Sequence, residues 1–154
     1  PPPHPTPPRE TIMTLQFEFQ CPISTDLALI RDLIRVHGRH CGLSADRLED
    51  LVVAVNEAVT NVLDHGGRTG MVTSRGGADG VVVEILDVAG RLTHEHLASA
   101  RLNPTASHGY GLWVIQQLCD EVVLEQTGLG SLLTLDLRAR PRAGRLDARR
   151  AVSA

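Results

Sequence analysis

Two polar residues on an otherwise apolar stretch could carry out acid–base and metal chemistry. Glu57 and Asn61 are four residues apart, so on an α-helix their side chains would project from the same side, one turn apart. A carboxylate can accept a proton from a hydroxyl group or a water molecule, and an amide oxygen suits a hard cation such as Mg²⁺. The alternative is a polar helix face that simply meets water, and the spacing alone does not decide between the two.

The residues around this pair predict the helix that would position them. Apolar residues recur at intervals of three and four through this stretch, as they do on one face of an α-helix. Ser44 precedes the pattern as a candidate N-cap, and Gly66 follows it as a stop signal. We therefore expect a helix over residues 45–65, with Glu57 opposite the centre of the apolar face.

Length and composition favour one globular domain. The chain has 154 residues, of which 42% are hydrophobic, enough for one core. No apolar run approaches the ~20 residues that span a bilayer, so we expect no membrane association and a cytoplasmic location. The net charge of −3 lacks the basic surface on which non-specific nucleic-acid binding depends, so DNA is not the expected partner. The three cysteines are widely spaced and odd in number, which predicts reduced core residues.

The absence of lysine excludes several kinds of nucleotide and amine chemistry. All fifteen basic residues are arginine. A P-loop needs the lysine of its motif, an ordinary protein kinase needs its strand lysine, and Schiff-base chemistry needs an amine. A nucleotide bound to this chain would therefore be held by backbone N–H groups, a metal ion and arginine.

The order of the predicted elements indicates an α/β two-layer sandwich. The pattern reads β-α-α-β-β-α-α-β-β, and its consecutive hairpins predict a mixed, mostly antiparallel sheet with helices on one face. We place the strands near residues 15–19, 71–74, 81–86, 121–126 and 131–137, and the other helices near 25–41, 95–100 and 112–119. A proline-rich arm over residues 1–13 and an arginine-rich tail over 138–154 flank this domain, which covers residues 14–137.

Three separated motifs resemble those of the GHKL ATPase superfamily, whose nucleotide-binding domain is the Bergerat fold. They are the helix with Glu57 and Asn61, Asp87 at the end of a strand, and the turn Gly109-Tyr110-Gly111 before a later helix. The sequence around the first and third motifs is most similar to that of bacterial anti-sigma-factor serine/threonine kinases. The resemblance implies ATP and Mg²⁺ as cofactors.

The same resemblance implies a role for each motif. Glu57 would be the general base and Asn61 the Mg²⁺ ligand, and Asp87 would accept a hydrogen bond from the exocyclic amine of adenine. The glycine-rich turn would let backbone N–H groups approach phosphate. The implied nucleotide-binding residues are Asn61, Asp87, Gly90, Gly109, Tyr110, Gly111, Leu112 and Thr134, the last on the adenine side. Residues 101–108 would form a lid.

One segment departs from the family pattern. Where the family has the pattern DxGxG, this chain reads Asp87-Val88-Ala89-Gly90-Arg91, with alanine and arginine in place of glycine. We expect the β-carbon of Ala89 to crowd the adenine. Two functions follow: a kinase that phosphorylates a small anti-sigma-factor antagonist, or a degenerate protein that binds a sigma factor or related partner with little or no ATP. Family members of this kind commonly form homodimers, so the resemblance also implies self-association.

Overall fold

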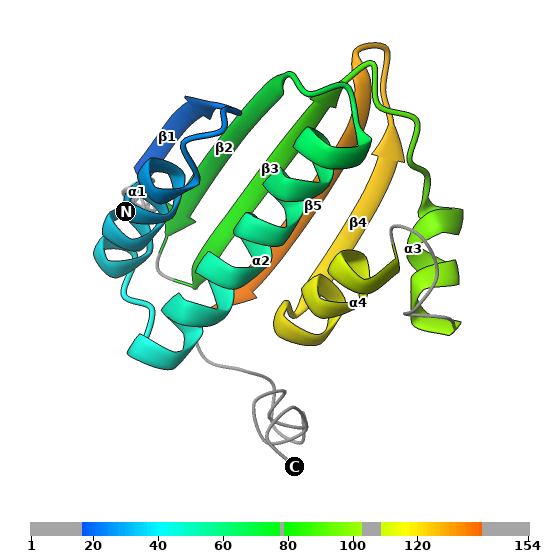
Figure 1. Ribbon diagram of the computed structural model, residues 1–154. Helices are drawn as coiled ribbons and strands as arrows, with labels where there is room; N and C mark the ends of the chain where they lie inside the picture. Colours follow the sequence, from blue (N-terminus) through cyan, green and yellow to red (C-terminus); the bar gives the residue numbers. More distant parts are fainter. Residues whose placement is uncertain (1–16, 78, 103–108, 140–154) are drawn as a thin grey trace, which may run out of the picture.

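The computed structural model describes residues 17–77, 79–102 and 109–139, and within them the predicted order of elements is confirmed. Five strands and four helices follow one another in that order (Figure 1). They are β1 (Phe17–Pro22), α1 (Leu27–His40), α2 (Ala45–His65), β2 (Gly70–Gly77), β3 (Gly80–Val88), α3 (His94–Leu102), α4 (Gly109–Leu118), β4 (Glu121–Gln126) and β5 (Gly130–Arg138).

The strands form one sheet in the order β1-β2-β3-β5-β4, and the helices cover one of its faces (Figure 1). This confirms the two-layer α/β architecture. All four strand pairings are antiparallel, so the parallel component of the expected mixed sheet is absent among the described strands. Two of the pairings, β2–β3 and β4–β5, are hairpins, in which antiparallel pairing is unavoidable.

Helix α2 is the central helix of the covering layer and has the predicted bounds. Ser44 accepts a hydrogen bond from the backbone N–H of Arg47, and Gly66 caps the other end. Its buried face includes Leu51, Val55 and Val59, which are at most 1% exposed. Since a helix of 21 residues is about 30 Å long, α2 spans the sheet from one end to the other.

Several predicted boundaries were wrong. The first strand ends at Pro22 and not near Phe19, and the helix expected from Leu112 begins at Gly109, so the predicted glycine-rich turn is the first turn of α4.

Helix α1 is capped by Asp26, whose carboxylate accepts a hydrogen bond from the N–H of Leu29, and not by the preceding Ser24 or Thr25. Arg138, which we placed at the start of the tail, is the last residue of β5, because its backbone still pairs with Gly80. The predicted N-terminal arm and the rest of the predicted tail lie outside the described residues.

An ion pair with little solvent exposure joins the start of α2 to the turn that precedes β4. Arg47, 8% exposed, contacts the carboxylate of Asp120 and donates a hydrogen bond of 3.3 Å to the carbonyl of Arg138. The backbone N–H of Arg138 donates to the same Asp120 carboxylate at 2.8 Å. Three elements, α2, the turn after α4 and β5, are thereby held together.

Cys21, Cys41 and Cys119 are buried and unbridged, as their spacing predicted. Among the described residues, no helix combines the length and the apolar character needed to cross a membrane.

Candidate functional site

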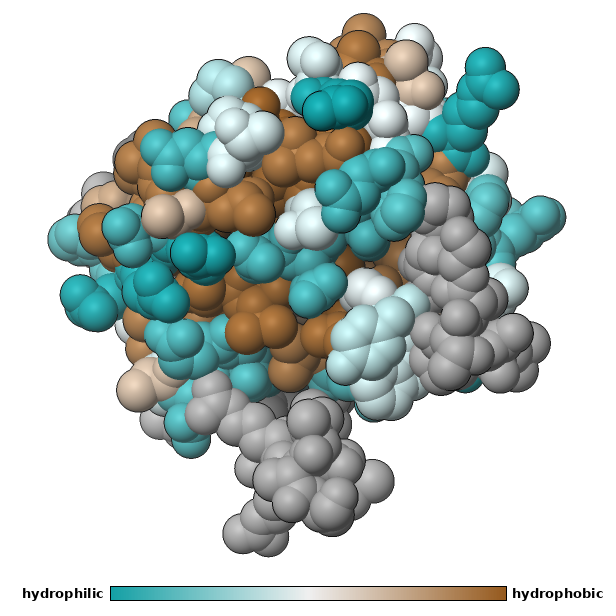
Figure 2. Space-filling model, in the orientation of Figure 1, coloured by the Kyte–Doolittle hydropathy of each residue, from teal (hydrophilic) through white to brown (hydrophobic). Residues whose placement is uncertain are grey.

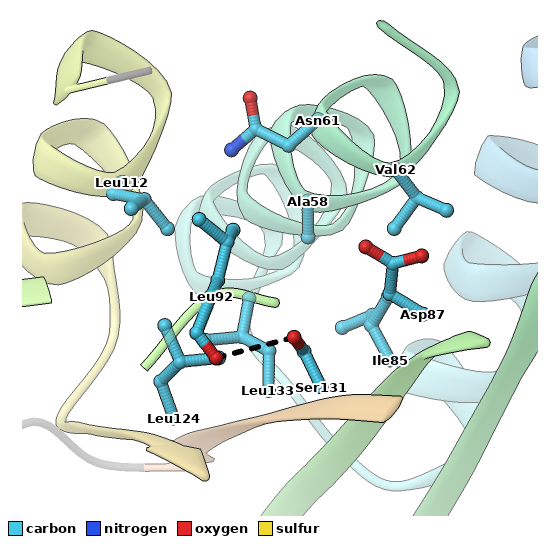
Figure 3. Close-up of a pocket in the computed structure, with 10 residues that line it drawn as sticks. All are labelled: Ala58, Asn61, Val62, Ile85, Asp87, Leu92, Leu112, Leu124, Ser131 and Leu133. Carbon is cyan, nitrogen blue, oxygen red and sulfur yellow. Dashed lines mark hydrogen bonds between the residues drawn. The ribbon is translucent and has the colours of Figure 1, made fainter. Parts of the chain in front are cut away.

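A pocket lies between the second half of α2, the end of β3, the start of β5 and the start of α4 (Figure 3). Most of its lining is apolar, and its polar side chains are Asn61, Asp87 and Ser131. Its cavity volume is about 20 Å³, enough to hold a water molecule. The remaining lining residues are Ala58, Val62, Ile85, Leu92, Leu112, Leu124 and Leu133.

Asp87 is the buried acid of this pocket. It stands at the end of β3, is only 4% exposed, and its carboxylate points toward α2 in Figure 3. The backbone N–H of Gly67 donates a hydrogen bond of 2.8 Å to its Oδ1. Burial raises the pKa of Asp87 and the hydrogen bond from Gly67 partly offsets that rise. The Asp87 carboxylate is therefore a hydrogen-bond acceptor that is removed from water and faces the pocket.

Glycines surround the Asp87 carboxylate. A β-carbon added to Gly66 would lie 2.1 Å from Oδ2 of Asp87, and one added to Gly90 would lie 2.4 Å from the same atom. Any other residue at these positions would displace the carboxylate. Gly90 was predicted as a site residue, and the structure places it against Asp87. Gly66 was predicted only as a helix stop, although the same glycine also makes room for the acid.

The two departures from the family pattern lie outside the pocket. Ala89 is exposed and does not line the pocket. The backbone of Ala89 has φ +63°, a left-handed conformation that favours glycine, and this turns its methyl group to solvent. The cost of alanine here is backbone strain. Arg91 is also exposed and is not a lining residue.

Glu57, Asn61 and Gly111 are brought together where α2 packs against α4. A β-carbon added to Gly111 would lie 3.1 Å from the amide oxygen of Asn61 and 3.2 Å from Oε2 of Glu57. Glu57 and Asn61 are both partly buried, so they do not form the water-facing surface that the alternative interpretation required. Asn61 also lines the pocket with Asp87. The carboxylate, the amide and the start of α4 thus form one continuous site.

The other predicted site residues at the start of α4 lie partly in the pocket wall and partly at the surface. Gly109 is the first residue of α4, and Leu112 is buried and lines the pocket. Tyr110 is 64% exposed and stacks on Trp113 outside the pocket, with ring centroids 6.2 Å apart. The greater part of the predicted lid, residues 103–108, lies outside the described residues.

Ser131 is a polar site residue that sequence reasoning missed. Its hydroxyl donates a hydrogen bond of 3.1 Å to the carbonyl of Leu92 and accepts one of 2.9 Å from the side chain of Gln126. The Gln126 amide also donates to the carbonyls of Gly90 and Leu92, at 3.1 and 2.8 Å. These bonds hold the segment after β3 against the start of β5, which forms one wall of the pocket.

Thr134, expected on the adenine side, lies on the opposite face of the sheet. Successive residues of a strand face opposite ways, and the buried residues of β5 are Ser131, Leu133, Leu135 and Leu137. Thr134 has the other parity, pairs with Glu84 of β3, and does not line the pocket. The pocket hydroxyl therefore belongs to Ser131, three residues earlier, and a hydroxyl directly after Gly130 was the available signal.

The site suits an adenine nucleotide by the chemistry of its groups. A desolvated carboxylate can accept from an exocyclic amine, and apolar side chains around it suit a purine ring. The glycine at position 111 leaves space beside the Glu57 and Asn61 side chains that a β-carbon would fill. No group of three or more His, Cys, Asp or Glu within the described ranges could hold a metal ion.

Residues 24–137 match the protein family described as histidine kinase-like ATPase domain. The match spans well over half of the chain and contains every residue of the site described above. No curated protein is significantly similar to the chain.

Proposed function

The chain belongs to the family of histidine kinase-like ATPase domains, and from this premise we propose that it is an ATP-dependent serine/threonine kinase of the anti-sigma-factor type. Its substrate in this proposal is a small antagonist protein, and its second partner is a sigma factor. The observation that supports the proposal most is the meeting of Glu57, Asn61 and Gly111 beside a pocket that contains a buried aspartate. An adenine site and a proton acceptor are then adjacent.

Asp87 would select the base in this mechanism. While it is ionised, its carboxylate accepts hydrogen bonds and cannot donate them, so it favours the amine of adenine over the carbonyl of guanine. Burial strengthens the preference for adenine. With guanine the buried carboxylate would face a carbonyl oxygen, and it would have neither a hydrogen bond from the base nor one from water. The bond from Gly67 and the surrounding glycines would keep the carboxylate in position.

Glu57 would accept the proton of the substrate hydroxyl, and Asn61 would supply one oxygen ligand to Mg²⁺. The two groups lie one helical turn apart, on the side of α2 that meets α4. Backbone N–H groups in the first turn of α4 would stabilise negative charge with the positive end of the helix dipole. ATP, when bound, supplies the phosphoryl group; these residues orient it and take up the proton.

The Glu57 role can be tested by phosphate transfer from γ-labelled ATP to a purified antagonist protein. Glu57→Gln should lower the transfer rate by about 10²- to 10⁴-fold, the usual contribution of a general base. Binding of ATP should change little. Asp64→Asn is the matched control, since Asp64 is exposed near the end of the same helix. Equal transfer by the wild type and Glu57→Gln would remove Glu57 from the mechanism.

A second candidate function is a partner-binding protein with weak or no ATP binding. One observation favours it: Ala89 occupies a backbone conformation that favours glycine. This protein would sequester a sigma factor or a related partner without phosphorylating it. Tight partner binding that is unaffected by ATP would support this candidate over the kinase.

A further inference from the structure

One face of the sheet is covered by helices, and the other carries none of the described helices. Figure 2 shows the covered side, where hydrophobic and hydrophilic surface is interspersed, and the second face of the sheet lies behind it (Figure 1). We call this second face the open face. Successive residues of a strand point to opposite sides, so the open face is formed by the residues that alternate with the buried core positions of each strand.

The open face is acidic. Its charged groups are five carboxylates and two guanidinium groups, from Glu18, Glu84, Glu121, Glu125, Asp136, Arg75 and Arg138. Toward β1, the carboxylates of Glu18 and Glu84 both pair with Arg75. Toward β4, Asp136 and Glu121 stand directly opposite each other, and no ion pair of the described residues includes either of them. The acidic surplus therefore lies over β4 and β5.

Like charges surround Asp136. Burial raises its pKa, the charge of Arg138 opposes that rise, and the carboxylates of Asp120 and Glu121 add to it. Asp120 already lies against Arg47 inside the fold. A further cation above Asp136 and Glu121 would stabilise their ionised forms. This part of the open face thus favours a positively charged occupant.

The chain carries such a charge directly after β5. Residues 140–154, which we call the basic segment, contain five arginines and one aspartate, a net charge of +4. Residues 1–139 contain ten arginines and 17 acidic residues, a net charge of −7. Strand β5 lies between β3 and β4 and ends at Arg138, two residues beyond Asp136. The basic segment therefore follows the sheet at its most acidic part.

We infer that the basic segment docks on the open face of its own chain, with its arginines against Asp136, Glu121 and the other carboxylates. Fifteen residues reach up to about 50 Å when extended. Five strands are about 20 Å wide, so the segment can reach every carboxylate of the face. Gly77 and Gly80, which stand level with Arg138, have no side chains to obstruct the way toward β2.

The contacts would act together. An exposed ion pair contributes little alone, but an arginine can bind a carboxylate through two parallel hydrogen bonds, and a tether keeps several arginines at high local concentration. The nucleotide-site pocket lies between the sheet and the helices. A segment docked on the open face consequently leaves that pocket uncovered.

Carbodiimide coupling of the full chain tests the docking, because the sequence has no lysine. Arg142→Lys introduces a single side-chain amine, and a carbodiimide joins an amine to a carboxylate that it contacts. Peptide mapping should show at least about 10-fold more coupling within the chain to Asp136, Glu121 or Glu84 than to Asp64, an exposed carboxylate of the helix layer. Equal coupling to Asp64, coupling only between chains, or no coupling would overturn the proposal.

Limited proteolysis supplies the second readout. Trypsin cleaves after arginine, so the rate of cleavage in residues 142–150 reports how often the basic segment leaves the face. The double variant Asp136→Asn, Glu121→Gln should be cleaved there about 5-fold faster than the wild type, and this difference should vanish in about 0.5 M NaCl. The matched control Asp64→Asn, Glu95→Gln neutralises two exposed acids of the helix layer and should be cleaved like the wild type.

Equal cleavage of the wild type and the Asp136→Asn, Glu121→Gln variant at low salt would contradict the inference. An unchanged far-ultraviolet circular dichroism spectrum of both double variants checks that the fold is kept. Neither measurement uses ATP, so their outcome is separate from the test of the kinase proposal.

Discussion

Two buried aspartates near opposite ends of α2 show how different the surroundings of the same group can be. Asp120, with a side chain 4% exposed, lies against the guanidinium of Arg47 and accepts a hydrogen bond from the N–H of Arg138. Asp87 is also buried, and its carboxylate accepts a hydrogen bond from the N–H of Gly67. One acid is paired with a cation, and the other is surrounded by glycine and apolar side chains.

The difference separates a structural acid from one suited to a ligand. A buried carboxylate with a cation and an N–H group has its acceptor capacity used within the fold. Burial without a cation disfavours the ionised form of a carboxylate and raises its pKa, as it does for Asp87. Such a group can recover free energy when a donor on a ligand reaches it. Burial alone therefore does not identify the functional residue; its surroundings do.

The largest expected effect is a loss of stability when the cation that pairs with Asp120 is removed. Arg47→Ala leaves Asp120 buried without its cation, and breaking a buried pair in this way typically costs about 3–5 kcal/mol of unfolding free energy. Urea denaturation would measure it. Arg35→Ala is the control, because Arg35 pairs with Glu49 and Asp32 at the surface and its loss should change stability little. A similar loss for both variants would contradict the special role of the buried pair.

An intermediate effect is expected from Gly111→Ala, which should lower function without lowering stability. The added methyl group lies 3.1–3.2 Å from Asn61 and Glu57, so both side chains must shift by a few tenths of an ångström. Displacements of this kind can lower a rate substantially, and we expect about a 10-fold loss of phosphate transfer. Stability should rise by up to about 1 kcal/mol, because alanine favours a helix over glycine. Loss of both activity and stability would instead indicate a packing defect.

The smallest expected effect distinguishes the two hydroxyls of β5. Ser131→Ala removes a hydrogen bond to the carbonyl of Leu92 and should weaken ATP binding by about 1 kcal/mol, since the wall that Leu92 belongs to is loosened. Thr134→Ala should leave ATP binding unchanged, because Thr134 faces away from the pocket. Calorimetric titration of both variants is the measurement. A larger loss for Thr134→Ala would reverse the assignment.

The elements of the fold were predictable because their signals are local. Helix α2 has the bounds 45–65 that its apolar period and its caps at Ser44 and Gly66 predicted. The cap of α1 was placed too early because Ser24, Thr25 and Asp26 are all good N-cap residues, and only the tertiary structure selects among them. The order of the strands across the sheet has no local signal, so the antiparallel pairings of β1 with β2 and of β3 with β5 could not be read from the sequence.

The site was predictable only in part because its members come from distant segments. The resemblance pointed to Glu57, Asn61, Asp87 and Gly111, and the structure brings these side chains and this glycine to one end of α2. Its apolar lining could not be found in this way, because a leucine that lines a pocket has the same local pattern as a core leucine. Ser131 and Thr134 show the remaining problem. Successive residues of a strand face opposite ways, so two residues three positions apart lie on opposite faces of the sheet, and matching the motif hydroxyl to Thr134 selected the wrong face.

The most direct test of the central claim is calorimetric titration of the wild type and Asp87→Asn with ATP and with GTP, each with and without Mg²⁺. We predict binding that requires Mg²⁺ and favours ATP, and a loss of about 10- to 150-fold in ATP affinity for Asp87→Asn, the value of one hydrogen bond to a charged group. Binding of ATP and GTP with equal affinity, or equal ATP affinity of the two proteins, would contradict the assignment of Asp87. No binding by the wild type would favour the partner-binding protein over the kinase.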